Sequence, residues 1–496
     1  MNGSFPREEK LAGYCWPQSL RPKETVTLHC HGEVGRVRVQ VVRQGAGERT
    51  VFDRSGIAVR PQPLGDDLAV QGCDWHPSLA FEVGEKWPSG FYLVRLTHDS
   101  GDRAEAFFVV RAAEPGEALL VLSTSTWTAY NDWGGPSFYT GGQAGSLRRP
   151  LPPGFLDKSD LMRHRIARFQ DWSKDDARAF AKAGHSPWCM AAGWANWERL
   201  FVAWAEAQGF RLGYATSADL DREAGLLDGY PCYLSVGHDE YWTMGMRDHV
   251  EAFIDGGGNA AFLSGNTAFW QARFEAGHSR LVCYKTALEA DPLHDPVRAP
   301  LLSTMWSDPL VGRPESLMTG VSFTRGGYAH MPNAPRGTGG YRVWQPDHWA
   351  FESLALEPGS LLGVDGLVVA YECDGCELVE RDGVLRAADG GVPEGFQVLA
   401  SASARLWETR QAPKGLHESY IGELNWVAER LGGGDTAANR ARFERGHAVM
   451  GTFRRGKGEV FTTGCTDWAY GLQCDDVATV TRNLLRRFTR RSGTAR

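Results

Sequence analysis

The first 112 residues carry the two-residue alternation of apolar and polar positions that is typical of β-strands. Four short runs show it, at residues 25–32, 36–45, 91–100 and 104–112, with Gly, Pro, Asp and Ser turns between them. Because evenly spaced short strands without helical patterns form sandwiches, we predict a β-sandwich of the immunoglobulin or fibronectin kind over residues 1–113.

The pattern changes at Leu119. Residues 118–126, "ALLVLSTST", form a continuous run suited to a strand that is buried on both faces of a parallel sheet. Helical and strand patterns then alternate, with predicted helices near 194–208, 217–226 and 243–255 and predicted strands at 211–216, 232–236 and 259–264. This order predicts a second domain over residues 114–496, of the α/β class, with a doubly wound and mostly parallel sheet.

The remainder of the chain is less regular. One more strand is predicted at 458–463, and a basic amphipathic helix at 475–491. Residues 300–420 mix short strands and loops whose order the pattern does not reveal. The run "GGG" at 256–258 precedes a strand rather than a helix, which predicts a tight turn and not a phosphate-binding loop.

Composition narrows the class of protein. The 496 residues are 42% hydrophobic and 23% charged, which is typical of a soluble, loop-rich globular protein of two or three domains. The net charge of −7 gives no sign of binding to nucleic acid or to an anionic membrane. No run reaches the roughly 18–20 apolar residues of a membrane span, and the N-terminal stretch has no apolar signal region. We therefore expect a cytoplasmic protein.

The cysteines and tryptophans add two expectations. Ten cysteines without a signal peptide favour reduced thiols. Cys373 and Cys376 form the one CxxC; zinc is an alternative, but we favour two thiols in a hairpin turn. Many of the 18 tryptophans lie in the middle third of the chain, which indicates a cleft walled by aromatic rings for a small polar ligand.

Polar side chains gather where three predicted strands end. Tyr130 follows the first strand, His238, Asp239 and Glu240 follow the second, and Asn266 follows the third. Because ligands bind at the carboxyl ends of strands in open α/β sheets, we expect these side chains to form a site. Helix caps and turns are the alternative reading of the same residues.

The residue types restrict the chemistry of such a site. The turn after the strand at 232–236 contains no Ser or Cys, which disfavours a nucleophile elbow and a thiol mechanism. Carboxylate, imidazole, phenol and amide groups are instead ligands for a hard metal ion and donors that can polarise a carbonyl.

Five separated motifs resemble the large subunit of N,N-dimethylformamidase and its relatives. They are "TWTAYNDWGGPSFY", "VGHDEYW", "GGNAAFLSGNTAFW", "RLVCYK" and "VAYECD", in the same order as in that family, and the resemblance covers residues 115–475. It implies a glutamine-amidotransferase-like α/β fold, and the leading sandwich resembles the domain that precedes it in many relatives.

The resemblance also implies a site. A mononuclear ferric ion, one per chain, would be held by Tyr130, Tyr139 and Glu240, with another divalent metal or no metal as alternatives. The catalytic residues carried over by motif are Glu372 as general base or proton shuttle, Asn266 and Lys285 as donors to a carbonyl, water or oxyanion, and His238 beside the metal.

Two departures from the family leave the substrate open. The chain lacks the inserted sandwich domain of the formamidase large subunit, and residues 139–160 differ where the family shapes its substrate pocket. We therefore predict a metal-dependent amidohydrolase that cleaves amide-type C–N bonds in a small-molecule substrate. A homo-oligomer and a separate small subunit both stay open. The alternatives are a non-catalytic, aromatic-lined small-ligand or sugar-binding protein and an iron-free, sugar-processing enzyme on the same fold.

Overall fold

The computed structural model describes residues 11–381, 384–388, 390–411 and 422–490, and the chain divides into two compact units. Unit 1 comprises Met1–Leu226 with Phe274–Val282, and unit 2 comprises Leu227–Arg273 with Cys283–Arg496. The predicted domain boundary between residues 113 and 114 stays a prediction. Residue 491 of the predicted final helix lies outside the described residues.

Unit 1 contains strands and short helices in chain order. They are β1 (Leu11–Trp16), β2 (Ser19–Leu20), β3 (Thr25–Gly32), β4 (Gly35–Gln44), β5 (Glu48–Val59), α1 (Leu68–Gln71), β6 (Leu79–Glu82), β7 (Gly90–His98), β8 (Arg103–Val110), β9 (Ala118–Leu122), α2 (Thr124–Tyr130), β10 (Ala144–Ser146), η1 (Ile166–Asp171), α3 (Lys174–Lys182), η2 (Pro187–Met190), α4 (Glu198–Ala207), β11 (Leu212–Thr216), α5 (Ser217–Arg222) and β16 (Arg280–Val282).

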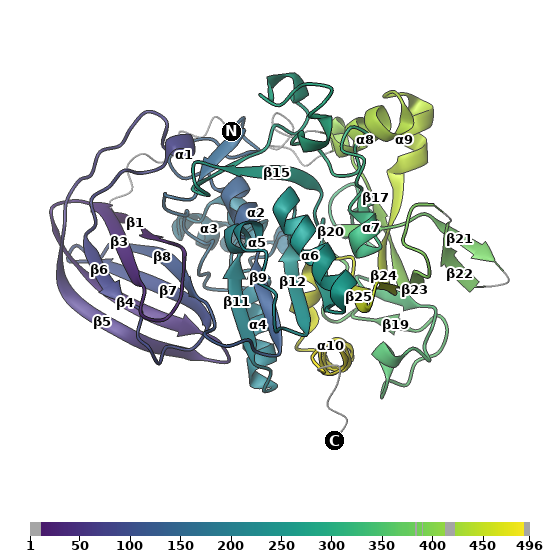
Figure 1. Cartoon of the computed structure of the whole chain (residues 1–496), viewed down its shortest axis with the longest axis horizontal. Helices are drawn as coiled ribbons and strands as arrows, with labels where there is room; N and C mark the ends of the chain where they lie inside the picture. The colour runs from purple at the N-terminus through teal and green to yellow at the C-terminus, as the bar shows by residue number, and fades with distance from the viewer. Residues whose placement is uncertain (1–10, 382–383, 389, 412–421, 491–496) are drawn as a thin grey trace. The chain divides into compact units, whose positions relative to one another are not determined.

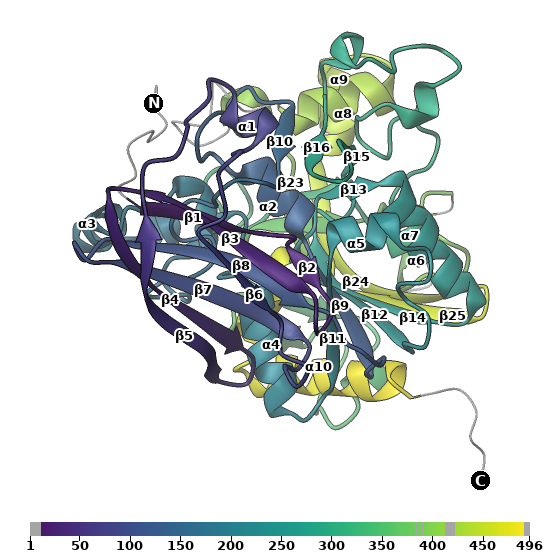
Figure 2. The ribbon, with the colours of Figure 1, turned by 60° about the vertical axis from the view of Figure 1, so that its left-hand side comes forward.

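The first eight strands form two sheets with a shared core. One sheet has the order β1-β3-β6 and the other β2-β8-β7-β4-β5, with antiparallel pairing except between β2 and β8 (Figures 1 and 2). Alternate Val, Leu and Phe side chains of both sheets are buried against one another. The strands predicted in 25–32, 36–45, 91–100 and 104–112 are confirmed as β3, β4, β7 and β8.

These sheets pack directly on the part of unit 1 that follows them in the chain. The Trp194 ring stacks on Phe91 with 4.0 Å between centroids, and its indole N–H donates to Gln44 Oε1 at 2.6 Å. Arg43 on β4 pairs with Glu206 on α4 at 2.6 Å. Because these contacts are largely buried, they explain why residues on both sides of position 113 fall in one compact unit.

The strand predicted over 118–126 is half wrong. β9 ends at Leu122, and Thr124–Tyr130 form the helix α2, whose residues are all buried. The Thr128 hydroxyl donates to the Thr124 carbonyl at 2.8 Å and the Ser125 hydroxyl donates to the Ser217 hydroxyl at 3.1 Å, so hydroxyl groups in α2 find partners inside and outside the helix. Tertiary burial therefore overrides the weak helix propensity of Ser and Thr, which the local pattern does not register.

Unit 2 holds most of the remaining elements. They are β12 (Cys232–His238), β13 (Tyr241–Thr243), α6 (Met244–Gly256), β14 (Asn259–Gly265), β15 (Trp270–Glu275, whose last two residues belong to unit 1), η3 (Leu288–Ala290), η4 (Ala299–Leu301), α7 (Ser316–Thr319), β17 (Ser322–Tyr328), β18 (Tyr341–Val343), η5 (Trp349–Phe351), β19 (Leu361–Leu362), β20 (Glu372–Gly375), β21 (Leu378–Arg381), β22 (Val384–Ala387), β23 (Gln397–Arg405), η6 (Thr409–Gln411), α8 (Glu423–Gly432), α9 (Ala437–Glu444), β24 (Arg445–Arg455), β25 (Gly458–Thr462), η7 (Thr466–Gly471) and α10 (Asp475–Phe488).

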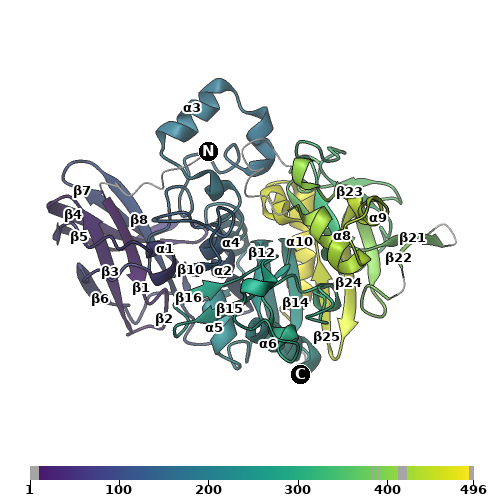
Figure 3. The same cartoon turned by 90° about the horizontal axis from the view of Figure 1, so that it is seen from above.

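The main sheet of unit 2 is mixed. Strands β12, β14 and β25 run parallel, and β24, β23, β17 and β20 continue the sheet with antiparallel pairing. Helices α6 and α10 both pack on β14, and Figure 3 shows them on opposite sides of it. The predicted turn at 256–258 is confirmed, because α6 ends there with Gly257 at φ +113° and β14 begins at Asn259.

Three local predictions are wrong in detail. The helix predicted from 194 begins at Glu198. Residues 241–243, where the helix predicted at 243–255 would begin, form the strand β13, and α6 begins at Met244 with the Thr243 hydroxyl capping it. Cys373 lies within β20 and Cys376 directly after it, rather than in a hairpin turn. The strand pairings of β13 and β20 are non-local, so neighbouring residues do not encode them.

β20 lies across the end of β14. Besides pairing with β17, it bonds to the segment after β25 through the Asp374 N–H, which donates to the Gly464 carbonyl at 3.0 Å. A Cβ at Gly265, the last residue of β14, would lie 2.5 Å from the Glu372 carbonyl oxygen, so only glycine permits this approach. The described residues include no helix long and apolar enough to cross a membrane.

Asp374 holds this junction together. Its Oδ1 accepts the Asn266 N–H at 2.8 Å and its Oδ2 accepts the Thr267 N–H at 3.0 Å. Burial raises the pKa of Asp374 from 3.8 to about 7, although the two N–H groups oppose that rise. The folded state therefore binds this proton more tightly than the unfolded chain does.

The contribution of Asp374 to stability should depend on pH. It is fully present below the unfolded pKa of 3.8 and is lost as the pH rises through about 7. Between about pH 5 and about pH 8, wild type should lose about 2–3 kcal/mol relative to Asp374→Asn, which cannot titrate. Thermal unfolding midpoints of both proteins test this, with exposed Asp66→Asn as control. Parallel pH profiles for wild type and Asp374→Asn would contradict it.

Candidate active site

The carboxyl ends of β12 and β14 lie side by side in unit 2. The parallel register places His238, the last residue of β12, opposite Gly265, the last residue of β14. Glu240 follows β12 by two residues and Asn266 follows β14 directly. The two neighbouring strands therefore bring these three polar side chains to one edge of the sheet, as the sequence predicts.

A buried chain of hydroxyl contacts fixes the turn that follows β12. The Ser235 hydroxyl lies 2.7 Å from Asp239 Oδ2 and 2.9 Å from the Ser264 hydroxyl, which in turn lies 2.9 Å from the Thr267 hydroxyl. The Asp239 carbonyl accepts the Ala268 N–H at 2.9 Å. Asp239 thus has a structural role, because its hydrogen bonds connect the ends of the two strands.

His238 lies between two carboxylates. Its Nε2 is 2.7 Å from Glu372 Oε2 and 3.3 Å from Glu240 Oε2, and Asn266 Nδ2 donates to Glu372 Oε2 at 3.2 Å. All four side chains are buried. Burial alone would lower the pKa of His238, but the carboxylates of Glu372 and Glu240 raise it well above its ordinary value.

The backbone around these residues is strained. Asn266, Ala268 and Lys285 all have positive φ angles, of +48°, +54° and +54°. Asn tolerates this left-handed region, whereas Ala and Lys occupy it at a cost of about 1 kcal/mol or more each. Within the described residues the buried Oδ1 of Asn266 has no hydrogen-bond partner, which makes it a candidate to orient a ligand.

Lys285 lies in the same region. Its Nζ is 5.4 Å from the centre of the Tyr241 ring and 5.5 Å from that of Trp270. Burial lowers the pKa of Lys285 to about 8, although the charges of Glu240 and Glu423 oppose that change. A lysine with this pKa is partly neutral near physiological pH and can give or take a proton there.

Glu423 is a member of the site that sequence reasoning missed. It is the first residue of α8, and burial raises its pKa to about 8, with further contributions from the charges of Glu372 and Glu240. In the sequence it stands in "GELNW", far from the other motifs. An acidic residue at the start of a helix is ordinary, so no local signal marks it.

Tyr130 and Tyr139, the predicted phenolate ligands, lie in unit 1. Tyr130 is the last residue of α2 rather than a residue just past a strand. The two rings stack with 4.3 Å between centroids, and Trp188 lies 5.9 Å from the first and 5.5 Å from the second. The structure therefore brings the two phenols together in unit 1, and the other predicted site residues together in unit 2.

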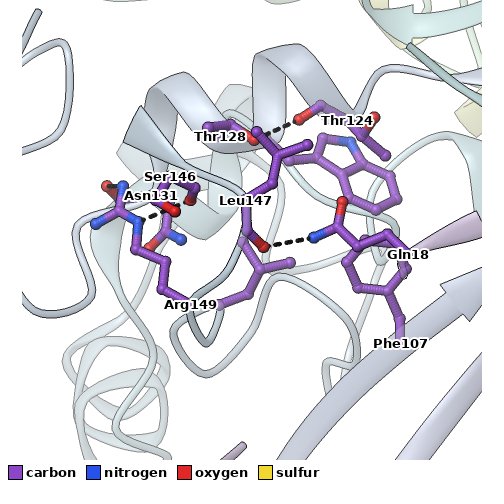
Figure 4. Close-up of a pocket in the computed structure, with 10 residues that line it drawn as sticks. Gln18, Phe107, Thr124, Thr128, Asn131, Ser146, Leu147 and Arg149 are labelled. Carbon is purple, nitrogen blue, oxygen red and sulfur yellow. Dashed lines mark hydrogen bonds between the residues drawn. The ribbon is translucent and has the colours of Figure 1, made fainter. Parts of the chain in front are cut away.

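A small pocket in unit 1 contains none of the predicted site residues (Figure 4). Arg149 extends along it and donates to the Trp133 and Asn131 carbonyls at 2.7 and 3.0 Å. Trp127 also lines it, and Trp127, Trp194, Trp197 and Trp242 are all buried in the core. Much of the aromatic richness of the sequence thus serves packing rather than a cleft.

The donor set suits a hard metal ion in residue type. The described part of the chain holds no group of three His, Cys, Asp or Glu side chains arranged to bind a metal ion, but phenolates stand outside that set. Phenolates and carboxylates are anionic oxygen donors, and such donors favour a trivalent ion over Zn²⁺. Within the described residues the buried Oδ1 of Asn266 has no hydrogen-bond partner, so it can accept a hydrogen bond from a molecule bound to such an ion.

The chain has relatives of known name. It is 24% identical to the N,N-dimethylformamidase beta subunit of Alcaligenes sp over 460 residues, which cover 84% of this chain and 55% of that protein. It is 23% identical to the N,N-dimethylformamidase beta subunit of Paracoccus aminophilus over 276 residues, which cover 51% of this chain and 36% of that protein. The chain thus spans about half the length of the first relative.

Likeness to solved structures is low. The sporulation control protein Spo0M from Bacillus subtilis matches 21% of this chain and 50% of its own at 14% identity, with a TM-score of 0.15. A likeness of this size assigns no fold.

A family model settles the wider relationship. The model described as "N,N-dimethylformamidase beta subunit-like, C-terminal" matches residues 36–481, which include every predicted site residue. The chain therefore belongs to the N,N-dimethylformamidase beta subunit-like, C-terminal family.

Proposed function

We propose that this protein is an amidohydrolase that cleaves amide-type C–N bonds in a small substrate. One observation carries the proposal: His238 and Asn266 both contact the buried Glu372 carboxyl group, at 2.7 and 3.2 Å, beside Glu240. The family supports amide bonds as the bonds that are cleaved, because two relatives are named as N,N-dimethylformamidase beta subunits.

Glu372 is the proposed general base. The His238 imidazole and the Asn266 amide hold its Oε2, so the carboxylate is oriented before the substrate arrives. A water molecule adds to the amide carbonyl carbon and gives its proton to Glu372. The C–N bond then breaks, and the same proton passes from Glu372 to the leaving nitrogen. Amide and water thereby become carboxylic acid and amine.

We further propose one ferric ion per chain, with Tyr130, Tyr139 and Glu240 as its ligands. Support comes from the anionic oxygen donors and from the stacking of the two tyrosines. When bound, such an ion polarises a carbonyl and lowers the pKa of water. The chain's own residues do the rest: Asn266 orients the substrate oxygen or the water, and Lys285 stabilises negative charge on the carbonyl oxygen.

The proposed fold assignment has two parts. For the α/β region we propose the glutamine-amidotransferase-like type, supported by the parallel strands β12 and β14 with α6 between them. For the first eight strands we propose an immunoglobulin- or fibronectin-like sandwich, supported by their two sheets and common core. A boundary between residues 113 and 114 belongs to the same proposal.

We also propose that the chain works in an assembly of more than one polypeptide, since its named relatives are beta subunits. Light scattering of the purified protein, followed by co-purification from the native host, should give a mass above that of one chain. An active monomer under both conditions would contradict this.

The metal proposal predicts colour. Tyrosinate bound to ferric iron absorbs visible light, so the protein reconstituted aerobically with iron should be coloured and contain about one iron per chain. Tyr130→Phe should abolish the colour, whereas Tyr230→Phe, outside the ligand set, should keep it. A visible spectrum with metal analysis is the measurement, and a wild-type protein that stays colourless and iron-free would refute the ligand set.

The base proposal predicts a loss of turnover without a loss of metal. Glu372→Gln should lower kcat for hydrolysis of N,N-dimethylformamide or another small amide by about 100-fold or more, because general acid–base catalysis contributes that much. The same variant should keep the colour. Released amine is the readout, and Glu380→Gln, on the exposed strand β21, is the matched control. Unchanged turnover in Glu372→Gln would remove Glu372 from the mechanism.

These experiments also separate the alternatives. A non-catalytic binding protein would bind a sugar or other small polar ligand and release no amine from any amide. An iron-free, sugar-processing enzyme would act on a sugar with no colour and no effect of Tyr130→Phe.

A further inference from the structure

Glu423 presents a buried carboxyl group to the proposed catalytic residues. Its charge interacts with those of Glu240, Glu372 and Lys285, although α8 is remote from them in the sequence. The Tyr328 hydroxyl donates to Glu423 Oε1 at 3.5 Å. In the described part of the chain the buried Oε2 has no hydrogen-bond donor. A buried carboxyl oxygen without a hydrogen-bond partner is unfavourable, which points to a ligand that donates there.

A row of aromatic rings links Glu423 to His238. Tyr371 lies edge-on to the His238 ring at 5.7 Å and is tilted against Tyr328 at 6.2 Å. Tyr328 in turn stacks on Trp407 with 3.7 Å between centroids. Ring faces beside a carboxylate attract organic cations, because the π-system and the carboxylate both carry negative potential.

Acidic side chains gather in this region. Glu240, Glu372 and Glu423 are three buried carboxyl groups, and the basic groups His238 and Lys285 interact with them. Each buried carboxylate is stable only when a positive charge or a hydrogen-bond donor compensates it. A positively charged ligand at Glu423 Oε2 supplies both.

We propose that Glu423, Tyr328 and Trp407 form the subsite for the amine half of the substrate and bind an alkylammonium ion as product. This rests on the proposed amidohydrolase function. Hydrolysis yields a carboxylic acid and an amine, and transfer of the acid's proton to the amine gives a carboxylate and an ammonium ion. The ammonium N–H donates to Glu423 Oε2, and the N-alkyl groups lie against the rings of Tyr328 and Trp407.

Direct titration tests the subsite without turnover. Isothermal titration of the full-length chain with dimethylammonium chloride, against sodium chloride at the same ionic strength, should show binding. Glu423→Gln, which removes the charge and keeps the shape, should weaken this binding by about tenfold or more. Glu429→Gln is the matched control: the residue is exposed on the same helix and should bind as wild type does.

Two results would overturn the subsite. One is equal affinity of wild type and Glu423→Gln for dimethylammonium, and the other is no binding by wild type. A competition experiment with the wild-type protein needs no variant and therefore still tests the subsite if Glu423→Gln fails to fold. Two competitors of similar shape, the cation tetramethylammonium and the neutral tert-butanol, are compared for displacement of dimethylammonium from wild type. The neutral tert-butanol should not displace it. Displacement by tert-butanol as strong as that by tetramethylammonium would overturn the role of charge.

The outcomes distinguish a failure of the amine subsite from a failure of the proposed amidohydrolase function. Dimethylammonium binding that depends on Glu423, in a protein that hydrolyses no amide, would leave the subsite standing and refute the proposed function. Amide hydrolysis with binding that does not depend on Glu423 would refute the subsite alone.

Discussion

The proposed chemistry of this protein depends on the imidazole of His238, which is buried between two carboxylates. His238 lies 2.7 Å from Glu372 and 3.3 Å from Glu240, and none of the three side chains is exposed to water. Each group would be unfavourable in this environment alone, and together they stabilise one another's charges. Removing the imidazole would leave both carboxylates without their shared partner, so the group acts as a unit.

The rest of unit 2 positions that group. The end of β14 permits the close approach of β20 because Gly265 has no side chain, and this approach carries Glu372 to His238. Asp374 then fastens Asn266 and Thr267 by their backbone N–H groups. Asn266 has a left-handed backbone conformation at this junction, and the surrounding hydrogen bonds and packing maintain that conformation.

The proposed function and the proposed amine subsite follow from the same excess of buried carboxylates. Glu372, held by His238 and Asn266, is suited to move a proton. Glu423 carries an oxygen that the described protein groups do not satisfy, beside stacked aromatic rings. A substrate whose amine product becomes a cation would contact the base Glu372 at the His238 end of this row of rings and the acidic group of Glu423 at the other end.

The sequence by itself determined the local elements and the polar strand ends. Alternating and continuous apolar runs predict β3, β4, β7, β8, β12 and β14, because side-chain periodicity follows directly from backbone geometry. Neighbouring parallel strands end together, so His238, Glu240 and Asn266 could be placed at one edge. The roles of Glu372 and Lys285 came from motif resemblance and not from any pattern.

Only the tertiary structure decided which distant residues complete the site. Glu372 comes from the segment 300–420, whose strands pair over long sequence distances, and Glu423 comes from a helix with no motif. The helix α2 likewise replaces a predicted strand, since complete burial outweighs the propensity of its Ser and Thr residues. Such contacts depend on how separate parts of the chain pack, and local patterns of polarity carry no record of that packing.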